Sequence, residues 1–168
     1  MSFKQAVESV PALKGAYRTG LQALNNRHKN LITADGNRLT GSVNLDKSLK
    51  KGKHAQASRW DYGIGYKINN FEVAVWVEVH PASSTGNLNE VVEKLKWLNK
   101  FLSGKWQSQL RAMTFRQYFW VATGRVNPRL SRKSRPGRML SRTRAEAARI
   151  HGPLQHLNLE EALDEVKR

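Results

Sequence analysis

The chain of 168 residues contains no cysteine. This absence excludes disulfide bonds, zinc sites built on thiolates and cysteine nucleophiles together. No apolar run approaches the roughly 20 residues that a membrane-spanning helix needs. The first residues, MSFKQAVESVPALKGAY, also lack the continuous apolar segment of a secretory signal. We therefore expect a cytoplasmic protein without a membrane partner.

Acidic residues are scarce as well. Thirteen Asp and Glu stand against 29 Lys and Arg, which gives a formal net charge of +16. A field of this sign attracts polyanions and raises association rates at low salt. The balance favours nucleic acid, DNA or RNA, as the partner, ahead of an acidic protein. Assembly proteins of the ribosomal type share this balance, so charge alone predicts a partner class and no activity.

The pattern of apolar residues predicts one α/β domain with a mixed central sheet. Period-two alternation indicates strands, and apolar residues spaced three and four apart indicate helices. Asn69-Asn70 fits a two-residue hairpin turn between the second and third strands. The expected elements are a helix over about 3–25 that Pro11 would split, strands over 38–45, 59–68 and 71–80, a helix over 90–103 and a strand over 114–123. Their order is helix, β-meander, helix, strand.

The composition changes after Gly124, where arginines become dense and proline and glycine punctuate the chain. We expect residues 1–124 to form the core, and residues 125–168 to form a basic C-terminal arm with a short helix at its end. Such runs are commonly solvated or disordered, but this density favours contact with phosphates. The expected nucleic-acid-binding residues are Arg125, Arg129, Arg132, Lys133, Arg135, Arg138 and Arg142.

The segment FEVAVWVEVH, from Phe71 to His80, is the strongest functional signal. Its strict alternation is typical of a strand with one face in a core. The other face ends in Glu78 and His80, which point the same way. A carboxylate beside an imidazole can ligate a metal or move a proton, although half-buried strands often end in polar residues without such a role.

Pairing across the Asn69-Asn70 turn would bring Asp61 opposite Glu78, with β-carbons about 4.5–5.5 Å apart. Two carboxylates at that distance repel each other unless a cation lies between them, which predicts a Mg²⁺ or Mn²⁺ site. The backbone carbonyl of Val79 would add a third oxygen, and His80 could orient or deprotonate a water. Glycines 63 and 65 on the same face leave room for a substrate backbone or a packed helix.

The order of elements, with an Asp on the second strand and Glu-x-basic on the third, resembles the PD-(D/E)XK nuclease-like superfamily over about residues 3–123. The resemblance implies a restriction-endonuclease-like fold that holds a divalent metal between Asp61, Glu78 and the Val79 carbonyl and hydrolyses phosphodiester bonds. His80 falls where the family has a lysine. Glu8, on the first helix, is where some members place a further acid.

The replacement of the family's lysine by His80 leaves three interpretations open. A lysine carries a permanent positive charge, whereas a histidine is mostly neutral at pH 7. Either His80 acts as the base, or Lys67 or Lys94 reaches into the site, or the site is inactive and the fold only binds. The expected function is metal-dependent phosphodiester hydrolysis on nucleic acid. The alternative is an inactive nuclease-fold protein that acts as a nucleic-acid-binding or assembly factor.

Overall fold

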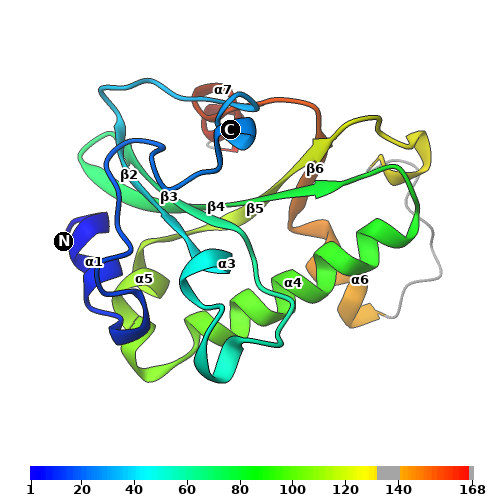
Figure 1. The fold of residues 1–168 in the computed structure, drawn as a ribbon. Coiled ribbons are helices and arrows are strands. Elements are labelled where there is room, and N and C mark those ends of the chain that lie inside the picture. Colours follow the sequence, from blue (N-terminus) through cyan, green and yellow to red (C-terminus); the bar gives the residue numbers. More distant parts are fainter. Residues whose placement is uncertain (132–140, 167–168) are drawn as a thin grey trace.

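The centre of the molecule is a five-stranded mixed sheet in the order β2-β3-β4-β5-β6 (Figure 1). The computed structural model describes residues 1–131 and 141–166, with only the backbone for 141–144 and 166. Strands β2, β3 and β4 form an antiparallel meander, and β5 and β6 continue the sheet in parallel. Their bounds are β2 Leu39–Asn44, β3 Tyr62–Ile68, β4 Phe71–Pro81, β5 Thr114–Thr123 and β6 Ile150–Leu154. The expected mixed α/β class is confirmed.

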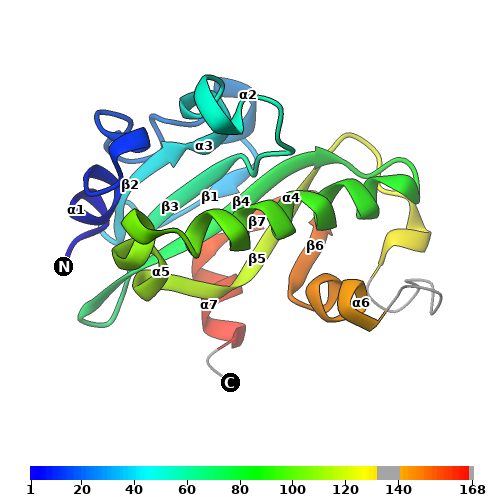
Figure 2. The ribbon, with the colours of Figure 1, turned by 90° about the horizontal axis from the view of Figure 1, so that it is seen from below.

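Each face of the sheet has its own apolar core (Figures 1 and 2). Helices α1, α4, α5 and α6 cover one face, and α7 with the two-stranded sheet of β1 and β7 covers the other. Among the described residues, no helix is long and apolar enough to cross a membrane. The remaining bounds are α1 Phe3–Glu8, α2 Asn26–Lys29, β1 Ile32–Thr33, α3 Leu45–Ser48, α4 Gly86–Leu102, α5 Ser108–Met113, α6 Ser141–Ala148, β7 Leu157–Asn158 and α7 Leu159–Val166, with short 3-10 turns at Pro11–Leu13, Gly52–His54, Lys105–Gln107 and Pro128–Leu130.

The hairpin between β3 and β4 has the predicted register. Ile68 pairs with Phe71 across the Asn69-Asn70 turn, and Tyr62 pairs with Val77 near the other end. Asn69 has a φ of 54°, in the left-handed region that Asn tolerates better than most residues. This register carries Asp61, just before β3, to the position opposite Glu78.

The expected helix over 3–25 is wrong beyond its first turns. Helix α1 ends at Glu8, a 3-10 turn begins at Pro11, and Arg18 then pairs with Ser42 of β2 as an isolated bridge. Proline has no backbone N–H to donate and its ring clashes with the preceding turn. The apolar residues that suggested one continuous stripe therefore belong to a turn and an extended segment.

Two side chains lie on a different face of the sheet from their period-two neighbours, and a third is exposed. Trp60 precedes β3 and packs edge-on against Tyr118 in the core beneath α1 and α4, whereas Tyr62 lies in the core on the other face. An irregularity in β2 between Leu39 and Gly41 places Leu39 against the second core. Phe71, expected on the apolar face of β4, is 74% exposed at the hairpin end.

Helix α4 carries the predicted core stripe but begins earlier than expected. Its N-terminal cap is Thr85, and the Asn87 side chain accepts a hydrogen bond from the Ser84 N–H. Glycine 104 follows the end of the helix closely, as expected. The buried residues of the stripe are Val91, Val92, Leu95, Leu98, Phe101 and Leu102.

Residues after Gly124 contribute to both the sheet and the second core. Strand β6 pairs with β5, β7 pairs with β1, and Leu159 and Leu163 of α7 are fully buried. The Asn158 side chain caps α7 by accepting from backbone N–H groups of its first turn. The fold therefore continues past the composition boundary at 124. The expected phosphate contacts Arg132, Lys133, Arg135 and Arg138, together with the side chain of Arg142, lie outside the described residues.

Candidate active site at the end of strand β4

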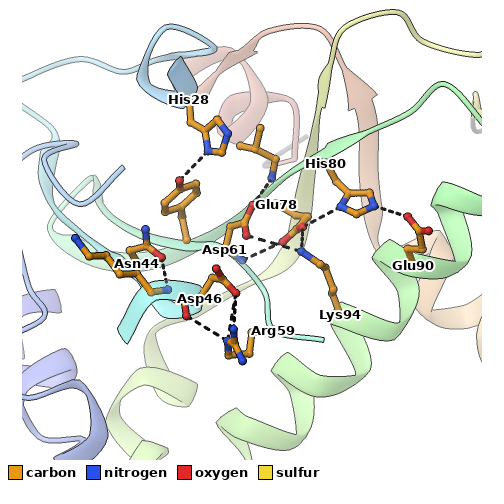
Figure 3. Close-up of polar contacts among 12 residues, drawn as sticks. His28, Asn44, Asp46, Arg59, Asp61, Glu78, His80, Glu90 and Lys94 are labelled. Atoms are coloured by element: carbon orange, nitrogen blue, oxygen red, sulfur yellow. Dashed lines mark hydrogen bonds and ion pairs between the residues drawn. The ribbon is translucent and has the colours of Figure 1, made fainter. Parts of the chain in front are cut away.

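Asp61 and Glu78 meet as the hairpin register predicts (Figure 3). The Asp61 N–H donates to Glu78 Oε2 over 2.9 Å, and the Val79 N–H donates to Asp61 Oδ2 over 3.1 Å. The Glu78 side chain is fully buried, and that of Asp61 is 15% exposed. Each carboxylate thus accepts from a backbone N–H across the hairpin. These bonds fix both side chains on the face of the sheet that α4 covers.

Lys94 of α4 completes the cluster. Its ammonium contacts Glu78 Oε1 and lies 3.8 Å from Asp61 Oδ1. Of the interpretations left open by His80, the one in which Lys94 reaches into the site agrees with this placement. Position 94 is three residues after Val91 and four before Leu98, so it borders the buried stripe. Its long apolar stem can cross the packed layer and bring the charged end to the sheet.

His80 lies beside Glu78 but is engaged on both ring nitrogens. Its Nδ1 is 3.6 Å from Glu78 Oε1, and its Nε2 is 2.6 Å from Glu90 Oε2. Asn87 in turn donates to the same Glu90 oxygen. Glu90 was missed by the sequence reasoning. Its spacing of four residues before Lys94, which places the two side chains on one helix face, was the available signal.

The charges of the cluster perturb its ionisations. Burial, and then the Glu78 carboxylate, raise the pKa of Asp61 from 3.8 to about 7 against the opposing effect of Lys94. Burial favours the neutral form of Lys94, but the two carboxylates outweigh it and raise its pKa. The Glu78 contact, helped by Glu90, raises the pKa of His80 against its burial. The imidazole is therefore held toward its charged form, in which it has no lone pair to act as a base.

The donor set suits a hard divalent cation. In the part of the chain that the structure describes, no three His, Cys, Asp or Glu side chains are grouped so as to hold a metal. Mg²⁺ needs fewer, because it keeps several waters and binds through one or two carboxylates and substrate phosphates. The Lys94 ammonium already places one positive charge between the carboxylates. Burial, and then the Glu78 carboxylate, still raise the pKa of Asp61, so the Lys94 charge does not fully offset them.

Two other acids, Glu8 and Asp46, have structural contacts. The Glu8 carboxylate accepts from the Gly15 N–H at 3.0 and 3.2 Å and closes the turn after α1. Asp46 binds the Arg59 guanidinium at 3.0 Å, and Arg59 also donates to backbone carbonyls of the loop before β3. Lys67, the other lysine considered, is exposed and lies near the turn end of the hairpin.

The space over the two β3 glycines is filled by the protein itself. A side chain at Gly63 would meet the Trp76 ring, and one at Gly65 would meet the Phe3 ring of α1 and the Thr40 hydroxyl. Of the two expectations for these glycines, the packed helix is therefore the one observed at Gly65. The Trp76 and Phe3 rings therefore occupy the space that these glycines leave on this face.

Arg125 and Arg129 lie at this same edge of the sheet. Strands β4 and β5 are parallel with Pro81 opposite Thr123, so the loops that follow both strands leave together. The Asn127 N–H donates to the Ala82 carbonyl over 2.7 Å and ties the two loops. Both arginine side chains are exposed. The described part of the basic segment thus begins at the end of the sheet to which the carboxyl end of β4 leads.

Comparison with known proteins adds no identification. No family model, no curated protein and no solved structure matches the chain.

Proposed function

We propose that the protein hydrolyses phosphodiester bonds of nucleic acid with the help of Mg²⁺ or Mn²⁺, on a restriction-endonuclease-like core. The observation that carries the proposal is the contact among Asp61, Glu78 and Lys94 on the face of the sheet that α4 covers. The order α1, β2–β4, α4, β5 also agrees with the resemblance drawn from the sequence. The lysine then comes from the helix instead of position 80 of the strand.

In this mechanism Asp61 and Glu78 would hold the cation, with the Val79 carbonyl as a further oxygen. The bound ion would lower the pKa of a water and offset charge on the scissile phosphate. Lys94 supplies a permanent cation within reach of both carboxylates, where it can hold the attacking water or stabilise the developing charge. His80, fixed by Glu90, positions Glu78 from the other side.

The basic segment supplies affinity without reading sequence. Arginine contacts to phosphates fix the orientation of a nucleic acid and carry no base information by themselves. Arg125 and Arg129, which follow β5, would be the first of these contacts. The others proposed are Arg132, Lys133, Arg135, Arg138 and Arg142.

The second candidate is an inactive nuclease-fold protein that binds nucleic acid or assists assembly. The contact between Lys94 and Glu78 favours it, because a lysine and a histidine already neutralise the buried carboxylate without a metal. The two candidates share the nucleic-acid partner and differ only in the chemistry at Asp61 and Glu78.

Cleavage assays separate the candidates. Labelled single- and double-stranded DNA and RNA are incubated with Mg²⁺ or Mn²⁺, beside EDTA, Asp61→Ala and Glu93→Gln. Glu93 is a matched control because it is an exposed carboxylate of α4 paired only with Lys96 among the described ion pairs. Metal-dependent cutting that is lost in Asp61→Ala and kept in Glu93→Gln supports the nuclease. Tight binding without cutting, in every metal and strand form, supports the binding factor.

A further inference from the structure

An open pocket of about 540 Å³ lies beside α4, beyond Lys94 toward the end of that helix. Its volume is within the range of about 300–1,000 Å³ that small-molecule sites occupy. The wall is aromatic: the Trp97 and Phe101 rings are stacked with centroids 5.2 Å apart and planes 17° from parallel. The rim is basic, with Lys53, Lys100 and Lys105. An aromatic wall and a cationic rim suit a ligand that has a planar ring and a negatively charged group next to that ring.

Trp106 stands at the edge of this pocket and is 57% exposed. The Lys105 ammonium lies 5.2 Å from the centre of its ring. Three other tryptophans, Trp60, Trp76 and Trp120, are fully buried in the core. An exposed indole contributes little to the stability of the fold, whereas its free face is available for stacking.

His54 closes the inner side of the pocket as an uncharged group. Its ring lies edge-on to Trp97 and Phe101, and its Nδ1 accepts the Trp97 indole N–H over 3.3 Å. Burial, and then the nearby Lys53 and Arg59 charges, lower the pKa of His54. The neutral ring therefore carries its proton on Nε2. The interior is apolar and neutral, and the positive charges stand outside it.

The pocket is connected to the acidic cluster through α4. Lys94, Trp97 and Phe101 are spaced three and four residues apart, so they lie along one side of the helix. Seven residues of helix correspond to about 10 Å. A stacked strand covers this in about three nucleotides at roughly 3.4 Å each.

We propose that this pocket binds an unpaired nucleobase of a single-stranded segment whose backbone crosses the Asp61–Glu78 pair. Trp106 stacks on the base, and Lys53, Lys100 and Lys105 meet the flanking phosphates. The inference rests on the proposed function only in taking nucleic acid as the substrate, and it requires no cleavage. A paired base offers no free face for such stacking, so the preferred substrate contains a single strand.

The test measures binding in EDTA, where metal-dependent cleavage does not occur. The probes are a fluorescent oligothymidylate and a strand of equal length whose residues are abasic. Trp106→Ala should weaken oligothymidylate binding about 10-fold and leave the abasic strand unchanged, since base–aromatic stacking is lost. Trp106→Phe should retain most of the affinity. Phe71→Ala, at another exposed aromatic on the hairpin end, should change neither.

An unchanged affinity of Trp106→Ala for oligothymidylate would overturn the proposal. Equal weakening for both strands would overturn it too, because the indole would then only support the lysines. The outcome is separable from that of the proposed function. Stacking on Trp106 by a protein that cuts nothing would reject the nuclease and keep the base site. Cutting without any effect of Trp106 would do the reverse.

Discussion

At the scale of single residues, the buried carboxylate of Glu78 organises the site. The Asp61 N–H, the Lys94 ammonium and His80 all approach it, and its side chain is fully buried. Burying a charge without a partner is costly, and removal of one partner from a buried ion pair commonly destabilises a protein by about 3–5 kcal/mol. The cluster therefore contributes to stability as well as to the proposed chemistry, and the two can be measured separately.

Replacement of Lys94 tests this coupling. Lys94→Met should lower the free energy of unfolding in EDTA by about 3–5 kcal/mol, because the two carboxylates lose their cation. Saturating Mn²⁺ should restore part of the loss by binding the folded state. Urea denaturation with and without Mn²⁺ measures both effects.

The control for that replacement is Lys96→Met. Its exposed pair with Glu93, at 2.7 Å, should contribute at most about 1 kcal/mol. Equal losses in the two variants, or no recovery of Lys94→Met with Mn²⁺, would contradict a cation site between Asp61 and Glu78.

The pKa of Asp61 predicts a dependence of stability on pH. Because its pKa is about 7 in the folded chain against an ordinary value of 3.8, the folded state binds a proton more tightly than the unfolded state. Its contribution to stability therefore falls as the pH rises from about 4 to 7. Asp61→Asn removes this titration, so in EDTA its Tm should exceed that of the unaltered protein above pH 7. Tm curves that run parallel from pH 5 to 8 would show that Asp61 does not titrate in this way.

At the scale of elements, the hairpin was predictable because its signals are local. Strict alternation in β4 and the Asn69-Asn70 turn together fix the register, and the register alone places Asp61 opposite Glu78. The placement of Lys94 was not predictable in the same way. A lysine at the border of an apolar stripe fits solvent or a buried partner equally well, and its partner lies 16 residues away on a strand.

Two elements pack closely where α1 meets β3 at Gly65. A methyl group there would meet the Phe3 ring and the Thr40 hydroxyl. Gly65→Ala should therefore lower the free energy of unfolding by about 1–3 kcal/mol through overpacking. Gly36→Ala, where a new methyl group would meet nothing within 4 Å, should change it by less than about 0.5 kcal/mol. Thermal or urea unfolding compares them, and equal stabilities would mean that α1 can shift at no cost.

At the scale of the whole molecule, the change of composition after Gly124 does not mark the end of the fold, because β6, β7 and α7 follow it. Strand β6 reads IHGPL, and glycine and proline are disfavoured inside strands. The glycine and the proline are tolerated because β6 is the last strand of the sheet and has only β5 to pair with. The short apolar pattern of α7 was readable because Leu159 and Leu163 follow helical spacing, and both are fully buried.

The net charge of +16 predicts that binding depends on salt. The structure predicts which residues contribute most to that dependence. Alanine at both Arg125 and Arg129 should reduce the slope of log affinity against log salt by about 2, since each phosphate contact contributes about 1. Alanine at both Lys4 of α1 and Lys14, which follows the next 3-10 turn, removes the same charge. Figure 1 shows α1 far from the carboxyl ends of β4 and β5. That pair should leave the slope nearly unchanged. Equal effects would mean that binding follows overall charge and not this edge.

The most direct test of the central claim, that Asp61, Glu78 and Lys94 form a nuclease site, is a single-turnover cleavage assay. It compares the unaltered protein with Lys94→Met and Lys67→Met, each first shown to be folded by circular dichroism. We predict metal-dependent cleavage that Lys94→Met slows by about 100-fold or more, the scale of losing one charge-stabilising group, and that Lys67→Met leaves intact. Equal rates in all three proteins, or no cleavage by the unaltered chain on any nucleic acid, would contradict the account.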